Sequence, residues 1–398
     1  MAETDVIIVG GGATGVGIAR DLAMRGADVQ LYERGGLGTG TTGHSHGVLH
    51  SGARYATTDP EGASECIREN DVLRDIAGEA VRETGGLFVQ LPGDDPQHCT
   101  ERLSACRDLG IPAEELSPAE ARDIEPELSP RVERAFRVPD GVIYPSRLVA
   151  ATAVSAREHG ASIHVNTPVS DILVDDGCVV GVETVDGERK ADHVINAGGA
   201  WASRIANLAD IDVPMAPTSG VMVSVAVPTV DSVINRCRPP TDGDIAVPHE
   251  SRIVLGTTST DVDDPETFPK DEAAVETMVR EGVALLPAVT DAAIEDVYWG
   301  VRPLYGGGGG RGRDASRGFQ VLDHTSDGRP GLTTVTGGKL TTHRLMAEAV
   351  TDAVCDHLGI EEPCRTERTP LPADDAETLD RWVGEFDAVN PADADEIG

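Results

Sequence analysis

The first 33 residues alternate between apolar and polar segments in a way that predicts a strand, a helix and a second strand. Residues 5–9 form a short apolar run, which is typical of a buried strand. A helical pattern then extends to about Arg25, and a second apolar run covers residues 28–32. The glycine-rich stretch GGGATG at residues 10–15 separates the first strand from the helix, and Glu33 closes the second strand. This order predicts a βαβ unit with a glycine-rich turn.

The glycines of this turn have the spacing of a dinucleotide-binding fingerprint. Gly10 permits the tight turn, Gly12 lets the backbone approach a pyrophosphate, and Gly15 lets the helix pack closely on the strand. The helix N-terminus offers N–H groups to the phosphates, and Glu33 can accept hydrogen bonds from ribose hydroxyls. We therefore expect a bound ADP moiety. The alternative is a glycine-rich turn in a sheet that binds no nucleotide.

Two later segments repeat the strand–glycine–helix form and favour FAD over NAD. Residues 192–196 lead into Ala197-Gly198-Gly199, and residues 332–336 lead into Gly337-Gly338 and a helix with apolar periodicity. A helix N-terminus beside the flavin ring can stabilise negative charge on the reduced ring. Either segment alone could be an ordinary β–α connection. Together they predict a site for a long cofactor, assembled from both ends of the chain.

The rest of the pattern predicts a second region. Strand-like runs cover residues 86–91, 220–256 and 297–304, and a capping box at Ser117–Glu120 predicts a short helix. Residues 172–185 predict a hairpin that turns at Asp176-Gly177. We expect an α/β fold in which a Rossmann-like FAD-binding domain is interleaved with a mostly antiparallel β-sheet substrate domain. The expected division is 1–85, 140–215 and 325–362 for the FAD domain, 86–139 and 216–324 for the substrate domain, and 363–398 for a truncated C-terminal extension. Within that extension, residues 374–398 resemble a helix that should continue.

The net charge of the chain indicates the salt concentration in which the protein works. The net charge is −35, and only three of the 33 basic residues are lysines. Dispersed acids with almost no lysine predict a surface adapted to molar salt, where screening acts within about 3 Å, and hence a halophilic archaeal source. The alternative is an acidic mesophilic protein. Binding to nucleic acid or directly to anionic lipid is disfavoured.

The cysteines and the apolar runs indicate a cytosolic protein. The seven cysteines are scattered without metal-site spacing, so we expect buried thiols and no metal. No apolar run approaches the roughly 18 residues of a membrane span, and the first residues lack the basic region of a signal peptide.

Several motifs carry a family resemblance. The segments GARY (52–55), GVRPL (300–304) and GGKLTT (337–342) resemble those of the catalytic (A) subunits of anaerobic glycerol-3-phosphate dehydrogenases, within the D-amino-acid-oxidase-like flavoenzymes. The resemblance runs from about residue 3 to 370. It implies FAD and the oxidation of sn-glycerol 3-phosphate to dihydroxyacetone phosphate in glycerol catabolism. It also implies an iron-sulfur membrane anchor and a second flavoprotein-like subunit, which pass electrons to quinone at the inner face of the cell membrane. The cysteine-rich C-terminal region of that family does not appear in this sequence.

The resemblance also implies which residues bind the cofactor. The residues expected along the pyrophosphate and ribityl chain are Thr41, Thr42, Gly43, Ser45 and His46. Thr342 is expected to cap the C-terminal flavin helix. The full expected set is Gly10, Gly12, Ala13, Thr14, Gly15, Glu33, Arg34, Thr41, Thr42, Gly43, Ser45, His46, Gly47, Val169, Ala197, Gly198, Gly338, Lys339, Leu340, Thr341 and Thr342.

Four basic residues in the matching motifs suit a phosphate-bearing substrate: Arg54, Arg302, Arg317 and Lys339. Arginine can bind phosphate through two parallel hydrogen bonds, whereas lysine acts as a point charge. The alternatives are structural ion pairs for the arginines and a surface remnant for the lysine. The segment at 218–222 departs from the family pattern, which leaves a substrate contact from that strand open.

His50 is the candidate base for the substrate hydroxyl, because histidine titrates in the required range. The alternative is that it binds the flavin or shapes the pocket. The glycine loop 306–310 could bind phosphate or be a flexible surface hairpin. Two other functions remain open: a related flavin oxidase acting on an amine or 2-hydroxy acid, and a non-catalytic flavin-binding subunit.

The charge generates a first prediction. The protein should fold and retain its flavin in molar KCl, and lose flavin near roughly 0.1 M salt, where the screening length reaches about 10 Å and acid–acid repulsion acts over longer distances. Flavin fluorescence after stepwise dilution of the salt measures this. Full retention after prolonged incubation at low salt would contradict the halophilic interpretation.

Overall fold

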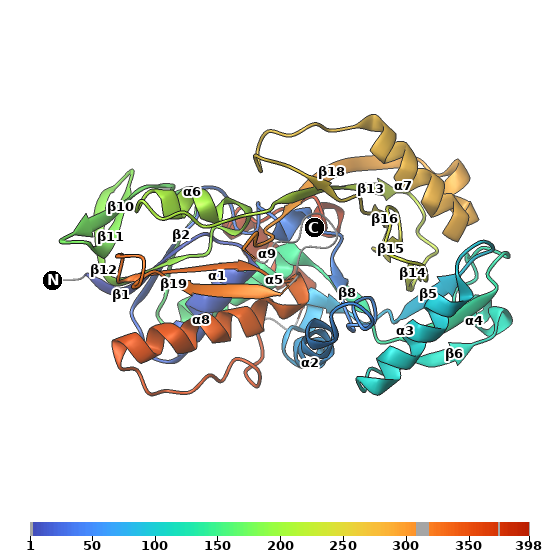
Figure 1. Cartoon of the computed structure of the whole chain (residues 1–398), viewed down its shortest axis with the longest axis horizontal. Helices are drawn as coiled ribbons and strands as arrows, with labels where there is room; N and C mark the ends of the chain where they lie inside the picture. The colour runs from blue at the N-terminus through green and yellow to red at the C-terminus, as the bar shows by residue number, and fades with distance from the viewer. Residues whose placement is uncertain (1–2, 308–317, 373–374, 398) are drawn as a thin grey trace.

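The computed structural model describes residues 3–307, 318–372 and 375–397 and contains two large sheets side by side (Figure 1). The first sheet has the strand order β10-β11-β12-β1-β2-β9, and β20 pairs with β12 and with β19. Strands β12, β1, β2 and β9 run parallel, as does the β12–β20 pair. The strands are β1 (Thr4–Val9), β2 (Val29–Tyr32), β9 (Ser162–His164), β10 (Val169–Asp175), β11 (Cys178–Thr184), β12 (Gly187–Asn196), β19 (Phe319–Asp323) and β20 (Leu332–Gly337).

Helices cover one face of this sheet, and a hairpin with a short helix covers the other (Figure 1). On the first face, Ile8 of β1 packs in one buried cluster with Leu22, Val149 and Val350 from three helices. On the opposite face, Ile7 packs with residues of the β10–β11 hairpin and of α6. The alternation of Ile7 and Ile8 follows from the two-residue period of a strand. The helices are α1 (Ala13–Met24), α5 (Pro145–Glu158), α6 (Ala202–Asn207), α8 (His343–Leu358) and α9 (Ala376–Glu385).

The second sheet is mostly antiparallel, with β14 and β5 as a parallel pair. Its order is β17-β13-β16-β15-β14-β5-β7-β6, and β18 pairs with β13. Helix α7 packs on one side, and the stacked rings of Phe88 and Phe136 pack with α3 on the other. The elements are β5 (Gly86–Gln90), β6 (Glu114–Leu116), β7 (Arg134–Val138), β13 (Thr218–Val225), β14 (Val233–Arg236), β15 (Ile245–Pro248), β16 (Ile253–Gly256), β17 (Thr260–Asp261), β18 (Ile294–Arg302), α3 (Pro96–Asp108), α4 (Pro118–Ile124) and α7 (Glu272–Leu285).

A small sheet and one helix lie where the two large sheets meet. The small sheet has the order β3-β8-β4, and helix α2 follows the segment that contains His50. A buried ion pair fixes α2 to α8, because Arg344 binds Glu69 through two hydrogen bonds of 2.6 and 2.7 Å. The elements are β3 (Val48–Leu49), β4 (Val81–Arg82), β8 (Gly141–Ile143) and α2 (Pro60–Ile76).

The local motifs fold as the sequence predicts. Ser117 and Glu120 form both hydrogen bonds of the capping box at the start of α4. The β10–β11 hairpin turns at Asp176 and Gly177, which have positive φ angles of 48° and 86°. This backbone conformation matches the right-handed twist of the paired strands.

Three details differ from the expectations. Strand β19 lies in the first sheet because it forms a hairpin with β20, although its residues fall in the range expected for the substrate domain. Cys178 is exposed, since it begins β11 directly after the hairpin turn, and Cys364 is half-buried, whereas the other cysteines are buried. The C-terminal helix ends at Glu385 instead of continuing, and Asp387 has a positive φ of 51°. The domain division as a whole stays a prediction.

After α9 the chain packs against the glycine-rich segment that follows β2. The amide of Leu37 donates to the carbonyl of Phe386, and the amide of Ala392 donates to that of Gly43. Asp393 is buried and accepts hydrogen bonds from the amide and the hydroxyl of Ser146, at 2.9 and 2.6 Å. Burial raises the pKa of Asp393 to about 7. The C-terminal segment is therefore part of the core around the first sheet.

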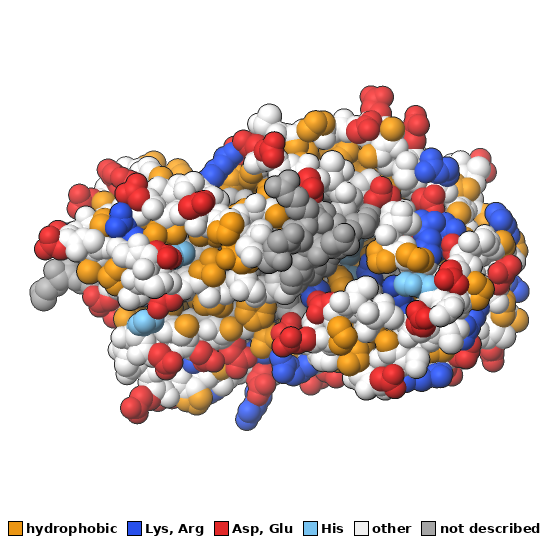
Figure 2. All heavy atoms as spheres, viewed as in Figure 1, with side chains coloured by type: hydrophobic (Ala, Val, Ile, Leu, Met, Phe, Trp, Pro, Cys, Tyr) orange, Lys and Arg blue, Asp and Glu red, His pale blue; other side chains and the backbone are white. Residues whose placement is uncertain are grey.

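Among the described helices, none combines the length and the apolar composition that a membrane-spanning segment needs. Acidic side chains are scattered over the face shown in Figure 2, and basic ones are most frequent toward the end formed by the second sheet. The acidic residues behind the net charge of −35 therefore do not gather in a single patch on that face.

The Asp393–Ser146 contact generates a stability prediction. Ser146→Ala should lower the free energy of unfolding by about 1–3 kcal/mol, because a buried carboxyl oxygen loses its hydroxyl donor. Urea titration at constant molar KCl measures the change without altering ionic strength. Ser64→Ala is the matched control, since the Ser64 hydroxyl is exposed and bonds only within α2. Equal losses in both variants would contradict the assigned role of the contact.

Candidate functional site

A cavity of about 450 Å³ lies at the carboxyl ends of the parallel strands β1, β12 and β20. Ligands of open α/β sheets bind at this edge, where loops from different strands converge. Its walls come from the turn after β1, the end of β2, the turn after β12 and the start of α8. The lining residues are Val9, Gly10, Gly12, Ala13, Thr14, Tyr32, Glu33, Arg34, Thr39, Gly40, Thr41, Thr42, Ser45, Pro168, Val169, Ala197, Gly198, Gly199, Trp201, Arg204, Ile205, Pro303, Val335, Thr336, Gly337, Gly338, Lys339, Leu340, His343 and Met346.

The turn after β1 packs so closely on neighbouring backbone that two of its positions have no space for a Cβ atom. Gly10 has a φ of +114°, and a Cβ there would lie 2.5 Å from the carbonyl oxygen of Ala197. A Cβ on Gly15 would overlap the carbonyl oxygen of Gly10, so α1 packs directly on the turn. Gly12 occupies the N-cap position of α1, where no side chain fills the space in front of the helix. This cradle fits a pyrophosphate at the helix N-terminus.

Glu33 lies at the end of β2 on the cavity wall. Its two carboxylate oxygens accept the amides of Gly11 at 2.7 Å and Gly35 at 2.9 Å. Each oxygen keeps a further acceptor site, so the carboxylate can also bind ribose hydroxyls. The two backbone contacts fix its direction.

The opposite wall is formed by the turn between β20 and α8. Gly338 has a φ of +73°, and a Cβ there would overlap the sulfur of Met346. Burial lowers the pKa of His343 to about 4, so its ring is neutral, and its Nδ1 lies 2.8 Å from the carbonyl of Leu340. Thr342 is the N-cap residue of α8, but its hydroxyl bonds the backbone of Lys339 and does not cap the helix. The single 3-10 turn before α8 brings the hydroxyl over Lys339.

The cavity wall contains most of the residues expected to bind the cofactor. Six of the expected residues are not part of the lining: Gly15, Gly43, His46, Gly47, Thr341 and Thr342. Gly43 instead makes room for the C-terminal segment, since a Cβ there would overlap the Asn390 side chain. Thr341 is buried and its hydroxyl accepts the amide of His50 at 3.0 Å. These residues shape the segments around the cavity.

His50 lies in a compact group of rings. The ring is buried, with centroids 5.8 Å from His46 and 5.4 Å from Tyr55. The next residue, Ser51, donates from its amide and from its hydroxyl to Asp140, both at 2.7 Å. Asp140 is fully buried, and burial raises its pKa. The segment that carries His50 is therefore held from both sides.

Lys339 connects the cavity wall with this group. Its ammonium lies 4.7 Å from the centre of the Tyr55 ring and 3.6 Å from the carboxylate of Asp59. Its side chain is only 6% exposed, which rules out a surface remnant. Asp59 also caps helix α2 through the amide of Gly62. Lys339 is thus oriented by the face of the Tyr55 ring and by the carboxylate of Asp59, which also caps α2.

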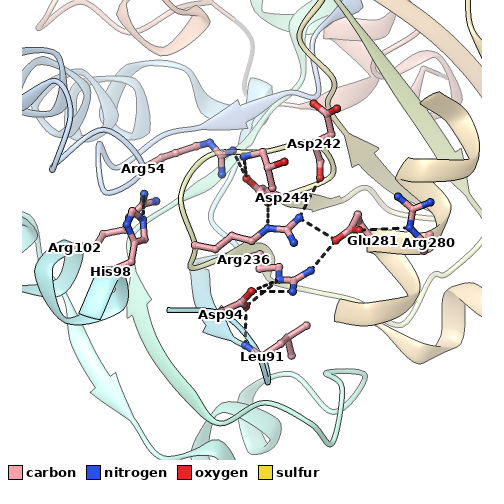
Figure 3. Close-up of polar contacts among 12 residues, drawn as sticks. Arg54, Leu91, Asp94, His98, Arg102, Arg236, Asp242, Asp244, Arg280 and Glu281 are labelled. Atoms are coloured by element: carbon pink, nitrogen blue, oxygen red, sulfur yellow. Dashed lines mark hydrogen bonds and ion pairs between the residues drawn. The ribbon is translucent and has the colours of Figure 1, made fainter. Parts of the chain in front are cut away.

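Arg54 forms a long ion pair with a carboxylate that it shares with another arginine. One of its Nη atoms lies 3.4 Å from Asp244 (Figure 3). The Asp244 carboxylate also binds Arg238 at 2.8 Å and the amide of Thr241 at 2.8 Å. Arg238 in turn binds Glu281 of α7. Because the Asp244 carboxylate is shared by two guanidinium groups, the charge of Arg54 is only partly neutralised.

Arg302 ends β18, next to Pro303 of the cavity wall. It donates to the hydroxyl of Thr218 at 3.3 Å, the hydroxyl of Thr257 at 3.2 Å and the carbonyl of Thr258 at 3.1 Å. The segment at 218–222 that departs from the family pattern therefore supports this arginine. A Cβ on Gly256, beside Thr257, would lie 3.8 Å from the His46 ring, so the loop that holds Arg302 also approaches His46.

One expected substrate-binding arginine and part of the glycine loop lie outside the described residues, and three residues at the site were not expected. Arg317 and residues 308–310 of the glycine loop lie outside the described residues. Tyr55, Asp59 and Asp140 were not expected at the site. Tyr55 directly follows Arg54 in its motif, and Asp59 precedes a helix, so adjacency and capping were the available signals. Across the described ranges, no cluster of three or more His, Cys, Asp or Glu side chains could hold a metal ion.

Comparisons with known proteins agree with this geometry. The family model for DAO, FAD dependent oxidoreductases, matches residues 5–344. The A1 subunit of the anaerobic glycerol-3-phosphate dehydrogenase of Haloferax volcanii is 48% identical, over 97% of this chain and 69% of that protein. The A subunit of the Escherichia coli enzyme with the same name is 46% identical, over 93% of this chain and 70% of that protein.

The solved structures share the fold. L-alpha-glycerophosphate oxidase from Mycoplasma pneumoniae, with FAD bound, has a TM-score of 0.76 at 21% identity, over 94% of this chain and all of that chain. Glycine oxidase from Geobacillus kaustophilus has a TM-score of 0.74 at 24% identity, over 93% and 98%. The residues at the cavity fit FAD, as these comparisons require. The chain therefore belongs to the DAO family of FAD-dependent oxidoreductases and, within it, to the family of anaerobic glycerol-3-phosphate dehydrogenase A subunits.

Proposed function

We propose that this chain oxidises sn-glycerol 3-phosphate to dihydroxyacetone phosphate, with FAD as the acceptor of a hydride from C2 at flavin N5. The names of the relatives support the substrate. The observation that carries the proposal is the buried Lys339, whose ammonium lies against the Tyr55 ring that packs beside His50. Arg54 beside a shared carboxylate and Arg302 held by threonines are the other described cations of the expected motifs. A phosphate dianion requires such charge, whereas a carboxylate substrate needs less of it.

The basic residues and His50 have different roles in this reaction. Arg54 and Lys339 bind the phosphate and orient the substrate, and Arg302 adds positive charge on the second-sheet side. His50 accepts the proton of the C2 hydroxyl as the hydride leaves C2. Its burial keeps bulk water away from that proton transfer.

The electrons pass on to a quinone through partner subunits. Several relatives are named as A subunits of a dehydrogenase, which supports the presence of other components in a complex. An iron-sulfur membrane anchor and a second flavoprotein-like subunit would hold this chain at the inner face of the cell membrane. The acidic composition agrees with docking through partners and not directly on anionic lipid.

The substrate prediction is tested by flavin reduction. Under anaerobic conditions in molar KCl, sn-glycerol 3-phosphate should bleach the flavin absorbance, and admission of phenazine methosulfate should restore it. Glycine and lactate at the same concentration should leave the flavin oxidised. Bleaching by an amine or a 2-hydroxy acid alone would identify a different oxidoreductase, and a flavin that no substrate bleaches would indicate a non-catalytic subunit.

The role of Lys339 is tested by Lys339→Met. The KM for glycerol 3-phosphate should rise roughly tenfold or more, because losing a charged contact to phosphate costs about 1.5–3 kcal/mol. Turnover of glycerol, which lacks the phosphate, should change little. Lys190→Met is the matched control, since Lys190 is exposed on β12. Equal losses on both substrates would mean that Lys339 serves the flavin.

A further inference from the structure

A loop from the second sheet reaches the edge of the FAD cavity. Residues 262–271 connect β17 to α7 and extend toward α6 of the first-sheet region (Figure 1). Within this loop, the carboxylate of Asp264 accepts the amides of Glu266 at 2.7 Å and Thr267 at 3.2 Å. The resulting compact turn presents the Glu266 side chain to the cavity edge.

The carboxylate of Glu266 binds three side chains that line the cavity. One oxygen accepts from Arg34 at 2.6 Å and from the indole N–H of Trp201 at 2.9 Å. The other oxygen lies 3.1 Å from Arg204, which also pairs with Asp264 at 2.8 Å. Hydrogen bonds from Arg34 and then Arg204 hold the pKa of Glu266 below its usual range, so it is ionised at neutral pH. Glu266 itself is not part of the cavity wall.

The three side chains come from two walls of the cavity. Arg34 directly follows Glu33 at the end of β2, whereas Trp201 and Arg204 follow the turn after β12. The Arg34 guanidinium stacks over the Trp201 ring at 4.6 Å. The same ring lies close to Gly40, since a Cβ there would be 3.2 Å from it. The Glu266 carboxylate thus joins the end of β2 to the turn after β12. Through the Trp201 ring it is also linked to the segment around Gly40.

We propose that Glu266 is a positioning residue that latches the cavity edge and slows the release of FAD. A cofactor of this length leaves only when the walls that enclose it separate. Separation of the β2 end from the turn after β12 breaks the contacts of Glu266 to Arg34, Trp201 and Arg204 together. Isolated exposed ion pairs contribute little, but several donors on one carboxylate act as a network. The proposal concerns cofactor retention and does not depend on the substrate.

The test compares Glu266→Gln with Asp263→Asn. Asp263 is an exposed acid on the same loop, so both variants remove one negative charge from the same surface. The holoprotein in molar KCl is mixed with an excess of an apo-flavoprotein that captures free FAD, and the loss of FAD from this chain is followed over time. Glu266→Gln should release FAD about fivefold faster than the wild type, a change within reach of a small ion-pair network. Asp263→Asn should stay within twofold.

Two further readouts separate the latch from general stability. The urea midpoint of the apoprotein should be the same in the wild type and in Glu266→Gln. Asp264→Ala, which removes the acceptor of both amides in the turn beneath Glu266 and does not line the cavity, should also accelerate release and serves as the second variant if Glu266→Gln does not fold. Release within twofold of the wild type in the Glu266 and Asp264 variants, or equal acceleration by Asp263→Asn, would overturn the proposal. Slower release from Glu266→Gln would also overturn it, since the carboxylate would then compete with FAD for the two arginines.

Discussion

The architecture depends on the close approach of three backbone segments at the end of β1. Gly10 faces the carbonyl of Ala197, and Gly15 at the first turn of α1 lies against the carbonyl of Gly10. Any side chain at these positions would push α1 and β12 away from β1. The cavity at the carboxyl ends of these strands exists because the segments meet without Cβ atoms between them. The N-terminus of α1 then faces the cavity with its N–H groups.

The acidic composition has a direct effect on the site. Every cation expected to bind substrate has to keep positive charge in a chain with 68 acids. At Arg54 this is achieved by sharing Asp244 with Arg238, and at Lys339 by placing the ammonium against the Tyr55 ring. A cation over an aromatic face is stabilised by the ring, and at Lys339 the Asp59 carboxylate 3.6 Å away provides a second partner. Both cations are therefore held by partners that they share with other groups.

The two ends of the chain meet around the cofactor cavity. The C-terminal segment packs on the residues after β2, with Asn390 filling the space beside Gly43 and Asp393 bonded to Ser146. Three residues before Gly43, Gly40 lies against the Trp201 ring that Glu266 holds. Segments from four distant parts of the sequence thus position one short loop.

The sequence by itself determined what depends on neighbours along the chain. The glycine turn and Glu33, the capping box at Ser117 and the hairpin at Asp176 follow from local backbone requirements, and the motifs around Arg54 and Lys339 indicated the family. The tertiary structure alone decided which residues partner each other across the sheets. No sequence pattern pairs Lys339 with Asp59, buries Asp140 against Ser51, or brings Glu266 to Arg34, because these contacts depend on where distant elements are placed by core packing. The end of the C-terminal helix at Glu385 is likewise a tertiary feature, since the chain beyond it packs beside Gly43.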